Sequence, residues 1–369
     1  MQSTINDAKI EEVCGKFLLS GEYKGFEILT SGHINTTYKV YMFRDGELKD
    51  YILQKLNTYV FKNPVEVMDN IARVTEYVRR KIKEKQTTAK RNVLHYSRTS
   101  DGLYYYADGD EFWRCYRYID GSVTYNLTSN LGIIEEAGKA FGEFQLYLAD
   151  YPAKELNIVI PHFHNTVMRY EAFKEAIAED LIKRAESVRP EIDGYLGFED
   201  VATKMYKMQK RRELPLKVTH NDTKCNNVLF DEKTGEHLSV IDLDTVMPGL
   251  VAFDFGDAIR FTANSAAEDE KDLSKVSLDM DKYDAFTNGF IGKVGKTLTD
   301  NEKSTMALGA ITMTVECGMR FLTDYLNGDK YFSVGYPEHN LVRARCQLAL
   351  AKDMLEKFDE MNAIVNKYL

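Results

Sequence analysis

The sequence predicts an α+β chain with two lobes, an antiparallel sheet that carries one main helix followed by a mostly helical second half. Short runs rich in aromatic and β-branched residues, separated by turn signals, fill residues 1–118. Apolar residues at three- and four-residue spacing dominate residues 119–369. This helical pattern breaks at residues 218–244, where polar residues lie between short apolar runs. We therefore expect one lobe of residues 1–118 and a second lobe of residues 119–369.

Size and composition agree with a globular chain of this kind. Its 369 residues, 44% hydrophobic and 28% charged, suit two packed lobes. The net charge of -9 argues against a nucleic-acid partner, because phosphate binding needs a clustered excess of Lys and Arg. No apolar run resembles a signal peptide or reaches the roughly twenty residues that span a bilayer. We expect a cytoplasmic protein without a membrane partner, a monomer or a weak oligomer, with its five scattered cysteines as free thiols.

The first lobe is expected to begin with a short amphipathic helix, because apolar residues recur at helical spacing from Ile10 to Leu18. The main helix starts at Asn63-Pro64, with the asparagine side chain as cap and proline at the first helical position. Its apolar stripe consists of Val67, Ile71, Val74, Val78 and Ile82. Strand patterns cover residues 25–29, 36–42, 51–56, 93–97, 102–107 and 112–118, with turns at 44–46 and at Asp108-Gly109.

The second lobe is expected to be helical apart from the polar segment, whose two short strands form a hairpin-like insert. The apolar stripes predict helices over residues 133–148, 167–188, 198–211, 278–290, 302–326 and 340–366. A sheet lobe followed by a helical lobe leaves a cleft between them in which a ligand can bind.

The polar segment carries residues suited to phosphoryl transfer. Its spacing is His220-x-Asp222-x-x-x-x-Asn227, and Asp242 follows at the end of a β-branched run. A carboxylate must accept the proton of an attacking hydroxyl, while an amide oxygen and a second carboxylate hold Mg²⁺ at the nucleotide phosphates. We assign Asp222 as the base, Asn227 and Asp242 as metal ligands, and Lys224 as a cation that stabilises the transferring group. The alternatives are a cluster of polar turn formers and an exposed loop lysine.

A loop between two strands of the first lobe could lie over the phosphates. Ser31, Gly32, Asn35 and Thr36 are the candidates for nucleotide binding, through backbone N–H groups and hydroxyls. A single glycine fits a plain hairpin loop equally well. His33 in the same loop is either a sugar or phosphate contact or a solvated histidine.

Gln54 occupies the strand position at which a kinase carries its phosphate-pairing lysine. Lys55 comes next, but neighbouring strand residues point to opposite faces, so Lys55 should not substitute. The usual ion pair with a carboxylate of the following helix is therefore in doubt, and Glu66, Asp69 and Glu76 remain open as its partner.

Several strings of residues resemble a known superfamily. Residues 219–227, 240–249 and 253–260 are similar to motifs of the aminoglycoside phosphotransferase and choline kinase-like superfamily, which has the bilobal protein kinase-like fold. Longer strings are similar to the N-acetylhexosamine 1-kinases within it, and they extend the likeness over nearly the full chain: residues 32–38, 51–54, 268–275, 316–321 and 336–343. The broad motifs indicate a phosphotransferase, whereas the longer strings indicate a sugar kinase.

The resemblance implies ATP-dependent phosphorylation, with Mg²⁺, of the anomeric hydroxyl of GlcNAc or GalNAc. It implies the same roles for the base and the metal ligands, with Asp222 also next to the sugar. His33, Arg320 and Tyr331 resemble residues of the sugar pocket. A glutamine in place of the strand lysine also belongs to these relatives, so Gln54 fits the resemblance.

Three residues near the polar segment have roles of a different kind. Asp254 is expected to cap or brace the catalytic loop. His220 is expected to hold the loop backbone by hydrogen bonds and not to transfer protons. Asp244 remains open between the surroundings of the metal and a contact to the sugar.

Alternatives remain for the pocket and for the function. Arg320 could be a helix surface residue or could pair with Glu316 one turn earlier. One rival function is another small-molecule kinase of the same fold that acts on choline, homoserine or an aminoglycoside, although Arg320 would repel cationic acceptors. The other rival is a non-catalytic binding protein, against which the complete set of Asp222, Asn227 and Asp242 argues.

Overall fold

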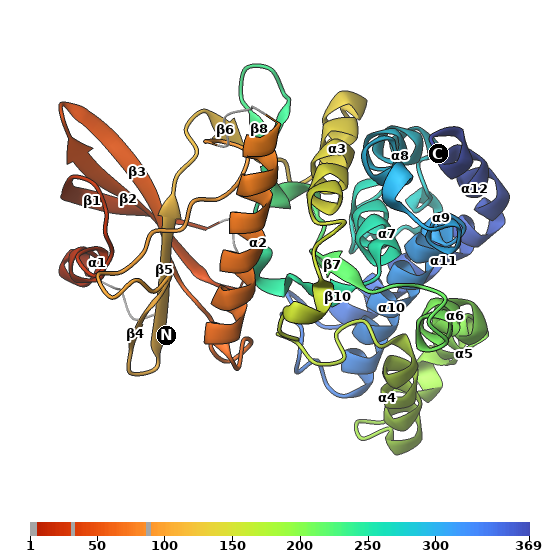
Figure 1. The fold of residues 1–369 in the computed structure, drawn as a ribbon. Helices are drawn as coiled ribbons and strands as arrows, with labels where there is room; N and C mark the ends of the chain where they lie inside the picture. The colour runs from red at the N-terminus through yellow and green to blue at the C-terminus, as the bar shows by residue number, and fades with distance from the viewer. Residues whose placement is uncertain (1–5, 31–33, 86–89) are drawn as a thin grey trace.

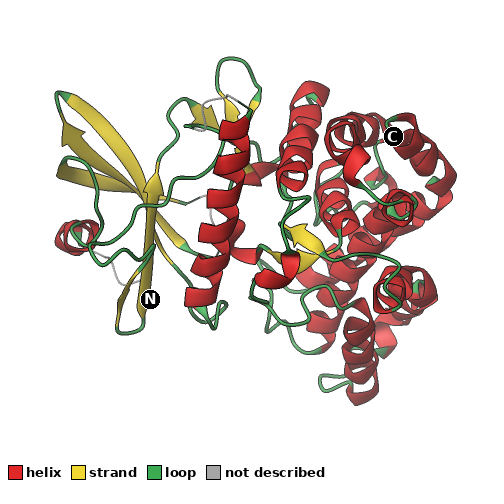
Figure 2. Cartoon of the chain, in the orientation of Figure 1, coloured by secondary structure: helices red, strands yellow, loops and turns green. Residues whose placement is uncertain are grey.

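The structure, a computed structural model, describes residues 6–30, 34–85 and 90–369 and has an N-terminal lobe built on a sheet and a C-terminal helical lobe (Figure 1). The first lobe is an antiparallel sheet of strand order β1-β2-β3-β5-β4, and the second is mostly helical (Figure 2). The strands are β1 (Glu22–Leu29), β2 (Thr36–Arg44), β3 (Glu47–Lys55), β4 (Tyr106–Asp108) and β5 (Glu111–Arg117). The short helix α1 (Asp7–Cys14) packs on the sheet, and α2 (Pro64–Glu84) stands between the sheet and the second lobe. The predicted fold class is confirmed.

Helix α2 joins the two lobes. It begins as predicted, with Pro64 at the first helical position, but the Asn63 side chain makes no capping hydrogen bond, so that part of the prediction is wrong. The Asn63 backbone departs from the extended conformation in which such a side chain reaches the helix N–H groups. All five residues of the predicted stripe are buried. They belong to a core cluster that includes Phe144 and Leu243 of the second lobe, so α2 packs on both lobes at once.

Two of the predicted strands are wrong or much shorter. Residues 93–97 form only an isolated bridge with β5, and residues 102–107 contribute only β4. A turn replaces the ladder there, because Thr99 N donates to Leu103 O at 2.8 Å while the threonine hydroxyl bonds the same carbonyl. Such local side-chain bonds compete with strand pairing. The hairpin predicted at Asp108-Gly109 is confirmed between β4 and β5.

The second lobe contains helices before, within and after the polar segment. They are α3 (Leu131–Tyr147), α4 (Thr166–Glu179), α5 (Arg189–Gly197), α6 (Glu199–Lys210), α7 (Val251–Thr262), α8 (Met280–Val294), α9 (Asp300–Lys303), α10 (Met306–Leu326), α11 (His339–Glu356) and α12 (Phe358–Lys367). Helix α10 is buried along almost its whole length and contacts α7, α4, α6 and α11. It is the central helix of this lobe.

Three of the predicted helices are divided or shortened. The helix expected over 167–188 ends at Glu179, because Asp180 adopts a left-handed φ of 37° and its carboxylate accepts hydrogen bonds from backbone N–H groups four and five residues on. The helix expected over 302–326 divides into α9 and α10. That expected over 340–366 divides into α11 and α12, with Lys357 between them.

Two observed helices, α5 and α7, lie outside the predicted set. Helix α7 is buried on almost every face, and it approaches α10 most closely at Gly256 and Gly309. A Cβ atom added to Gly256 would lie 2.2 Å from the Gly309 carbonyl oxygen, which is far inside van der Waals contact. The two helices therefore touch backbone to backbone.

Two small sheets hold the polar segment. Strands β6 (Ser122–Val123), β8 (Val228–Asp231) and β9 (His237–Val240) pair in the order β6-β8-β9, and β7 (Lys217–Thr219) pairs with β10 (Met247–Gly249). The predicted hairpin-like insert is confirmed as β8 and β9. Ile241 N donates to Asn227 O at 2.9 Å, which places the loop before β8 beside the loop after β9.

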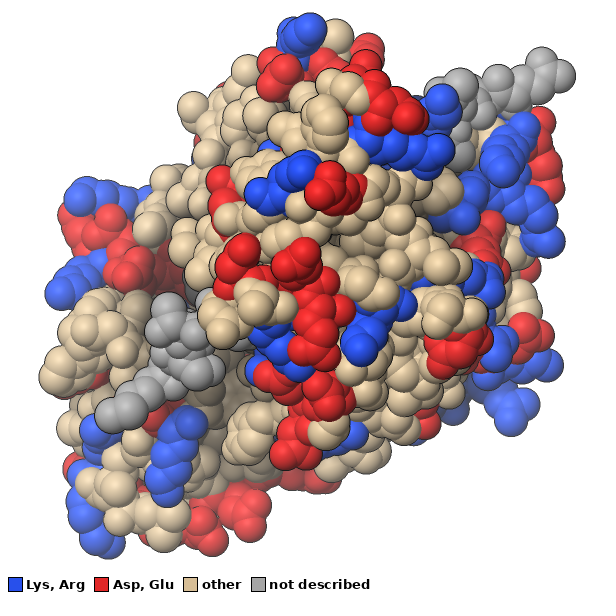
Figure 3. All heavy atoms as spheres, turned by 90° about the vertical axis from the view of Figure 1, so that its left-hand side faces the viewer, with Lys and Arg blue, Asp and Glu red and all other residues tan. Residues whose placement is uncertain are grey.

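None of the helices in the described part of the chain is long and apolar enough to cross a membrane. On the face that the first lobe presents in Figure 3, Lys and Arg side chains lie interspersed with Asp and Glu side chains.

Candidate active site

The candidate catalytic loop, residues 220–227, is held in place by α7. Asp254 in the first turn of α7 accepts hydrogen bonds from the backbone N–H groups of His220 and Asn221, both at 2.8 Å. It also accepts from Gln145 Nε2 at 2.6 Å, yet burial raises the pKa of Asp254 despite these donors. Asn221 has a φ of 64°, a left-handed conformation that few non-glycine residues adopt and that active sites tend to contain. The expected brace by Asp254 is therefore present.

His220 holds the loop and keeps no ring nitrogen free for proton transfer. Its Nε2 lies 2.9 Å from the Ile241 carbonyl oxygen, and its Nδ1 accepts from Asp222 N at 3.2 Å. With Nδ1 as an acceptor, this pairing has Nε2 as the donor to the Ile241 carbonyl. The ring packs edge-on against Phe141 and Phe144. The role expected for His220 agrees with these contacts.

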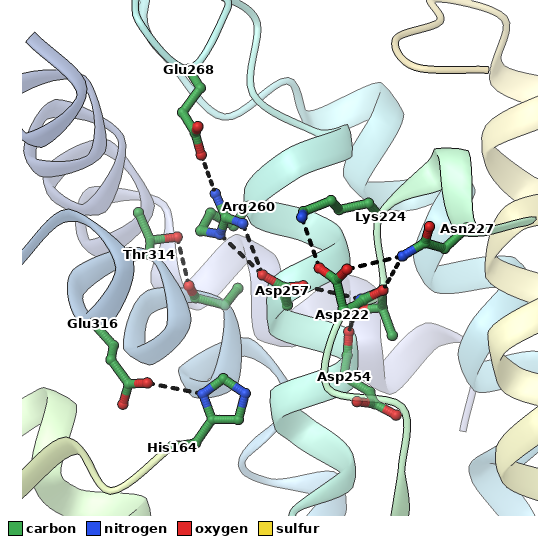
Figure 4. Close-up of polar contacts among 12 residues, drawn as sticks. His164, Asp222, Lys224, Asn227, Asp254, Asp257, Arg260, Glu268, Thr314 and Glu316 are labelled. Carbon is green, nitrogen blue, oxygen red and sulfur yellow. Dashed lines mark hydrogen bonds and ion pairs between the residues drawn. The ribbon is translucent and has the colours of Figure 1, made fainter. Parts of the chain in front are cut away.

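Asp222 lies between a cation and an amide (Figure 4). Its Oδ1 is 2.9 Å from Lys224 Nζ, and its Oδ2 accepts from Asn227 Nδ2 at 3.1 Å. Burial alone would lower the pKa of Lys224, but Asp222 and Asp257 raise it well above its ordinary value. Lys224 is therefore charged. Because Asn227 also donates to the Asp222 backbone carbonyl at 2.9 Å, its Nδ2 faces Asp222 and its Oδ1 remains available as an acceptor.

Asp242 has the properties expected of a carboxylate that binds a cation. It adopts a left-handed φ of 59° and borders the same cleft as Asp222 and Asn227. The loss of water at the cleft walls, followed by the negative charges of Asp244 and Asp222, raises the pKa of Asp242, although part of this residue is exposed. A bound divalent cation would relieve this repulsion, so the donor set of Asn227 and Asp242 fits Mg²⁺.

The described residues contain no group of three or more His, Cys, Asp or Glu side chains that could hold a metal by themselves. Two protein ligands are nevertheless typical of Mg²⁺ at nucleotide sites, because the ion keeps waters and takes the remaining oxygens from phosphates.

A cleft of about 320 Å³ lies between the lobes and contains most of the predicted residues that are described. Its lining includes Asn35, Gln54, Asp222, Lys224, Asn227 and Asp242. On β2, Thr37 borders the cleft, whereas Thr36 is exposed and outside its lining. Ser31, Gly32 and His33 lie outside the described residues.

Gln54 lies on the cleft side of β3, and Lys55 on the other side. Gln54 donates to Thr37 Oγ1 at 3.0 Å and accepts from Arg114 Nε at 2.8 Å. Lys55 forms an ion pair with Glu111, so it does not substitute for the strand lysine, as expected. Sequence reasoning missed Arg114, whose guanidinium is the cation closest to Gln54 in these contacts; an arginine inside a strand carries no motif.

Asp244 is 3% exposed, and both of its oxygens are hydrogen bonded. One accepts from Arg114 Nη1, and the other from Asn35 Nδ2 at 2.6 Å. These bonds join the two lobes. A sugar contact by Asp244 and nucleotide binding by Asn35 stay predictions.

Arg320, on α10, lies beside two aromatic rings. Its guanidinium carbon is 5.7 Å from the centre of the Tyr331 ring and 5.4 Å from that of Phe332. Tyr331 is 72% exposed, and its backbone is fixed because Asp324 accepts hydrogen bonds from the N–H groups of residues 330–332. The structure thus brings the predicted pair Arg320 and Tyr331 together on one surface.

A buried carboxylate lies one turn before Arg320. Glu316 accepts from Thr166 Oγ1 at 2.6 Å and pairs with His164 Nδ1 at 2.9 Å, so the alternative in which it pairs with Arg320 is wrong. His164 Nε2 is buried without a hydrogen-bond partner, as is Arg169 Nε. Burial, and then the charge of Arg320, lower the pKa of Arg169. Sequence reasoning missed His164 and Arg169, which are single residues without a spacing signal.

Two residues of α7 link the catalytic loop to the loop after that helix. Asp257 accepts from Thr223 N at 3.1 Å and forms an ion pair with Arg260 at 2.9 Å. Arg260 continues to Glu268 at 2.8 Å (Figure 4). A row of charged side chains on α7 therefore connects the catalytic loop at Thr223 with the loop that contains Glu268.

Known proteins share this fold. A family model described as "Phosphotransferase enzyme family" matches residues 25–286. A microcompartment-associated aminopropanol kinase superposes with a TM-score of 0.60 at 13% identity, covering 96% of this chain and 98% of that chain. Choline kinase from Cryptosporidium parvum Iowa II superposes with a TM-score of 0.56 at 14% identity, covering 98% of this chain and 99% of that chain. Spectinomycin phosphotransferase, in complex with ADP and spectinomycin, superposes with a TM-score of 0.53 at 14% identity, and the match covers 100% of both chains.

Proposed function

Since this chain belongs to the phosphotransferase enzyme family, we propose that it transfers the γ-phosphoryl group of ATP to the anomeric hydroxyl of an N-acetylhexosamine, GlcNAc or GalNAc, to give the sugar 1-phosphate. The observation that carries this proposal is the cluster in the cleft, where Asp222 lies between Lys224 and Asn227 with Asp242 beside them. Phosphoryl transfer needs positioned groups and fixed charge more than covalent chemistry from the protein. This cluster supplies both.

Each residue of the cluster has a role in the proposed reaction. Asp222 accepts the proton of the sugar O1, which is more acidic than an ordinary alcohol, as the new O–P bond forms. Lys224 remains charged and stabilises negative charge on the transferring group. Asn227 and Asp242 would hold Mg²⁺, which neutralises phosphate charge when it is bound. The ADP in the spectinomycin phosphotransferase complex supports an adenine nucleotide as the donor.

The acceptor is inferred from the cationic surface near α10. A guanidinium donates hydrogen bonds to sugar hydroxyls or to the carbonyl of an N-acetyl group, and an aromatic ring can stack on a sugar face. Arg320 with Tyr331 and Phe332 offers both kinds of contact, and Arg169 adds a second positive charge nearby.

The rival acceptors are cationic. Structural likeness to an aminopropanol kinase and a choline kinase favours an amino alcohol, but two arginines would repel an ammonium group.

The test is a panel of GlcNAc, GalNAc, choline, homoserine and kanamycin with MgATP and coupled ADP detection, with phosphorus NMR to identify a sugar 1-phosphate. We expect turnover with an N-acetylhexosamine, and faster turnover of choline or kanamycin would overturn the proposal. Asp222→Asn keeps the side-chain volume and should abolish turnover while MgADP still raises the melting temperature. Near-normal turnover by that variant would refute the assignment of the base. Failure of ATP and Mg²⁺ to stabilise the parent protein would favour the non-catalytic alternative.

A further inference from the structure

The strand lysine that is absent from β3 has a counterpart elsewhere in the sheet. We propose that Arg114, on β5, is the positioning residue of the nucleotide site: through its buried ion pair with Asp244 it fixes the sheet against the metal-binding segment. This inference rests on the proposed function only in taking the cleft as the nucleotide site.

The sheet register places Arg114 where it can replace a residue at position 54. Gln54 pairs directly with Arg114 across β3 and β5, so the two side chains lie on one face of the sheet. Arg114 Nε donates to Gln54 Oε1 at 2.8 Å, and its Nη1 donates to Asp244. Gln54 thus carries an acceptor that aims the guanidinium at the second lobe.

Further contacts of Asp244 show that the Arg114–Asp244 pair lies where four segments of the chain meet. Its second oxygen accepts from Asn35 Nδ2 at 2.6 Å, and Asn35 Oδ1 accepts from Asn57 N at 3.0 Å. The start of β2, strands β3 and β5, and the 242–244 segment therefore meet at one point. Asp242, the candidate metal ligand, is two residues from that point, so a movement of the junction would move the metal site.

Helix α2 does not provide this connection. Asp69 bonds Arg73, and Glu76 bonds Arg98, so these two of the three acidic residues left open by the sequence pair with residues outside the cleft lining. Instead α2 is attached to the second lobe by Asn70, whose Nδ2 donates to Val246 O at 2.8 Å. The ion pair that a kinase forms between strand and helix is thus formed here between strand β5 and the second lobe.

The chemistry of the pair requires arginine. Arg114 is 1% exposed and Asp244 3%, so each needs the other to offset the loss of water. Burial would lower the pKa of Arg114, but Asp244 raises it overall, and the side chain stays charged. A guanidinium can bond Gln54 and Asp244 through separate N–H groups in a fixed plane, which an ammonium cannot do in the same geometry.

The experiment measures ADP binding by calorimetry, with and without Mg²⁺, for the variants Arg114→Gln, Arg114→Lys, Asp244→Asn and Arg114→Gln/Asp244→Asn. Because no acceptor is present, a wrong sugar assignment leaves the result intact. We expect each single variant to weaken ADP binding at least about tenfold, in either condition, and the double variant to bind no more weakly than the weaker single variant. A steady-state comparison should show KM for ATP raised by a similar factor and kcat changed less.

The matched control is Arg91→Gln. Arg91 also pairs with a carboxylate of the second lobe, at 2.7 Å from Asp231, but lies outside the cleft lining. The Arg91→Gln variant should be less stable than the parent protein and should bind ADP with the parental affinity. Should the Arg114 variants fail to fold, Gln54→Leu removes the bond that aims the guanidinium, together with the bond to Thr37 Oγ1, and should still weaken ADP binding several-fold.

Three results would overturn the proposal. The first is a folded Arg114→Gln or Gln54→Leu protein with ADP affinity within about twofold of the parent. The second is additive losses in the double variant. The third is an effect confined to the samples with Mg²⁺, because it would assign the residues to the metal and not to the junction.

Discussion

Replacement of Asp254 by alanine should separate the stability of the catalytic loop from its chemistry. The carboxylate accepts hydrogen bonds from His220 N, Asn221 N and Gln145 Nε2, and it is 1% exposed. Alanine leaves two buried backbone N–H groups without an acceptor, each at a cost of ~1–3 kcal/mol. Part of this is returned, because the raised pKa of Asp254 shows that its burial is itself unfavourable. We expect a net loss of ~2–4 kcal/mol in the free energy of unfolding.

Asparagine at the same position should cost less, ~1–2 kcal/mol, because its amide oxygen can still accept from one backbone N–H. Both variants should lower kcat more than they raise KM for ATP, since a displacement of about 1 Å at the base can cost ~10²-fold in rate. Urea unfolding gives the free energies, and coupled ADP release gives the kinetic constants.

The control is Asp231→Ala, which removes a carboxylate at the end of β8 that also accepts two backbone N–H groups but lies outside the site. Asp231 accepts from Lys233 N at 3.0 Å and Thr234 N at 3.1 Å in the turn of the β8–β9 hairpin. It should lose stability and keep kcat at a temperature where it is folded. If the free energy of unfolding of Asp254→Ala is within about 1 kcal/mol of that of the parent, or if the variant keeps the parental kcat, Asp254 does not hold the catalytic loop as we infer.

The remaining expectations concern a partly buried histidine, a helix contact and the proposed metal ligand. Burial would lower the pKa of His237, but hydrogen bonds to Glu143 and a second glutamate raise it. The stabilisation that charged His237 provides is thus complete below about pH 6.5 and is lost as the pH rises through the pKa of His237 in the folded protein. His237→Gln should therefore lower the free energy of unfolding more at about pH 5.5 than at about pH 9. A pH-independent difference between variant and parent in urea unfolding would contradict this. Gly256→Ala should lower the unfolding free energy by ~1–3 kcal/mol or more, because its Cβ would clash with the Gly309 carbonyl, and an unchanged melting temperature would refute the tight contact. Asp242→Asn should lose Mg²⁺-dependent ADP binding in calorimetry. Without metal and at alkaline pH, the variant should be at least as stable as the parent, because the raised pKa of the native Asp242 carboxyl means that its charged form is less favourable in the folded protein than in the unfolded chain.

Features that depend on local pattern could be predicted from the sequence. The stripe of α2, the β8–β9 insert and the polar loop all follow from spacing along the chain, and the structure contains each of them. Helix α7 was not predicted because it is buried on nearly every face, which removes the polar side that makes an amphipathic stripe visible.

Features that depend on distant partners could not be predicted. Glu316 is four residues from Arg320, the spacing of a helix ion pair, but its oxygens are taken by His164 and Thr166 from about 150 residues earlier. Arg114 is a charged residue in a strand and would be expected at the surface, but Asp244 on the other lobe makes its burial favourable.

The contact between Gly256 and Gly309 has a consequence for how such a protein could change its acceptor over evolution. Helix α7 carries the carboxylates that hold the base loop, and α10 carries Arg320 at its other end. Because these helices meet without intervening side chains, backbone contact fixes α10, with Arg320, relative to the helix that holds the Asp222 loop. Side chains around Tyr331, which is largely exposed, could then be exchanged while Asp222 keeps its place. Under the proposed function, new acceptors would be accessible to this scaffold by substitution around Tyr331, without rebuilding the residues proposed to perform the transfer.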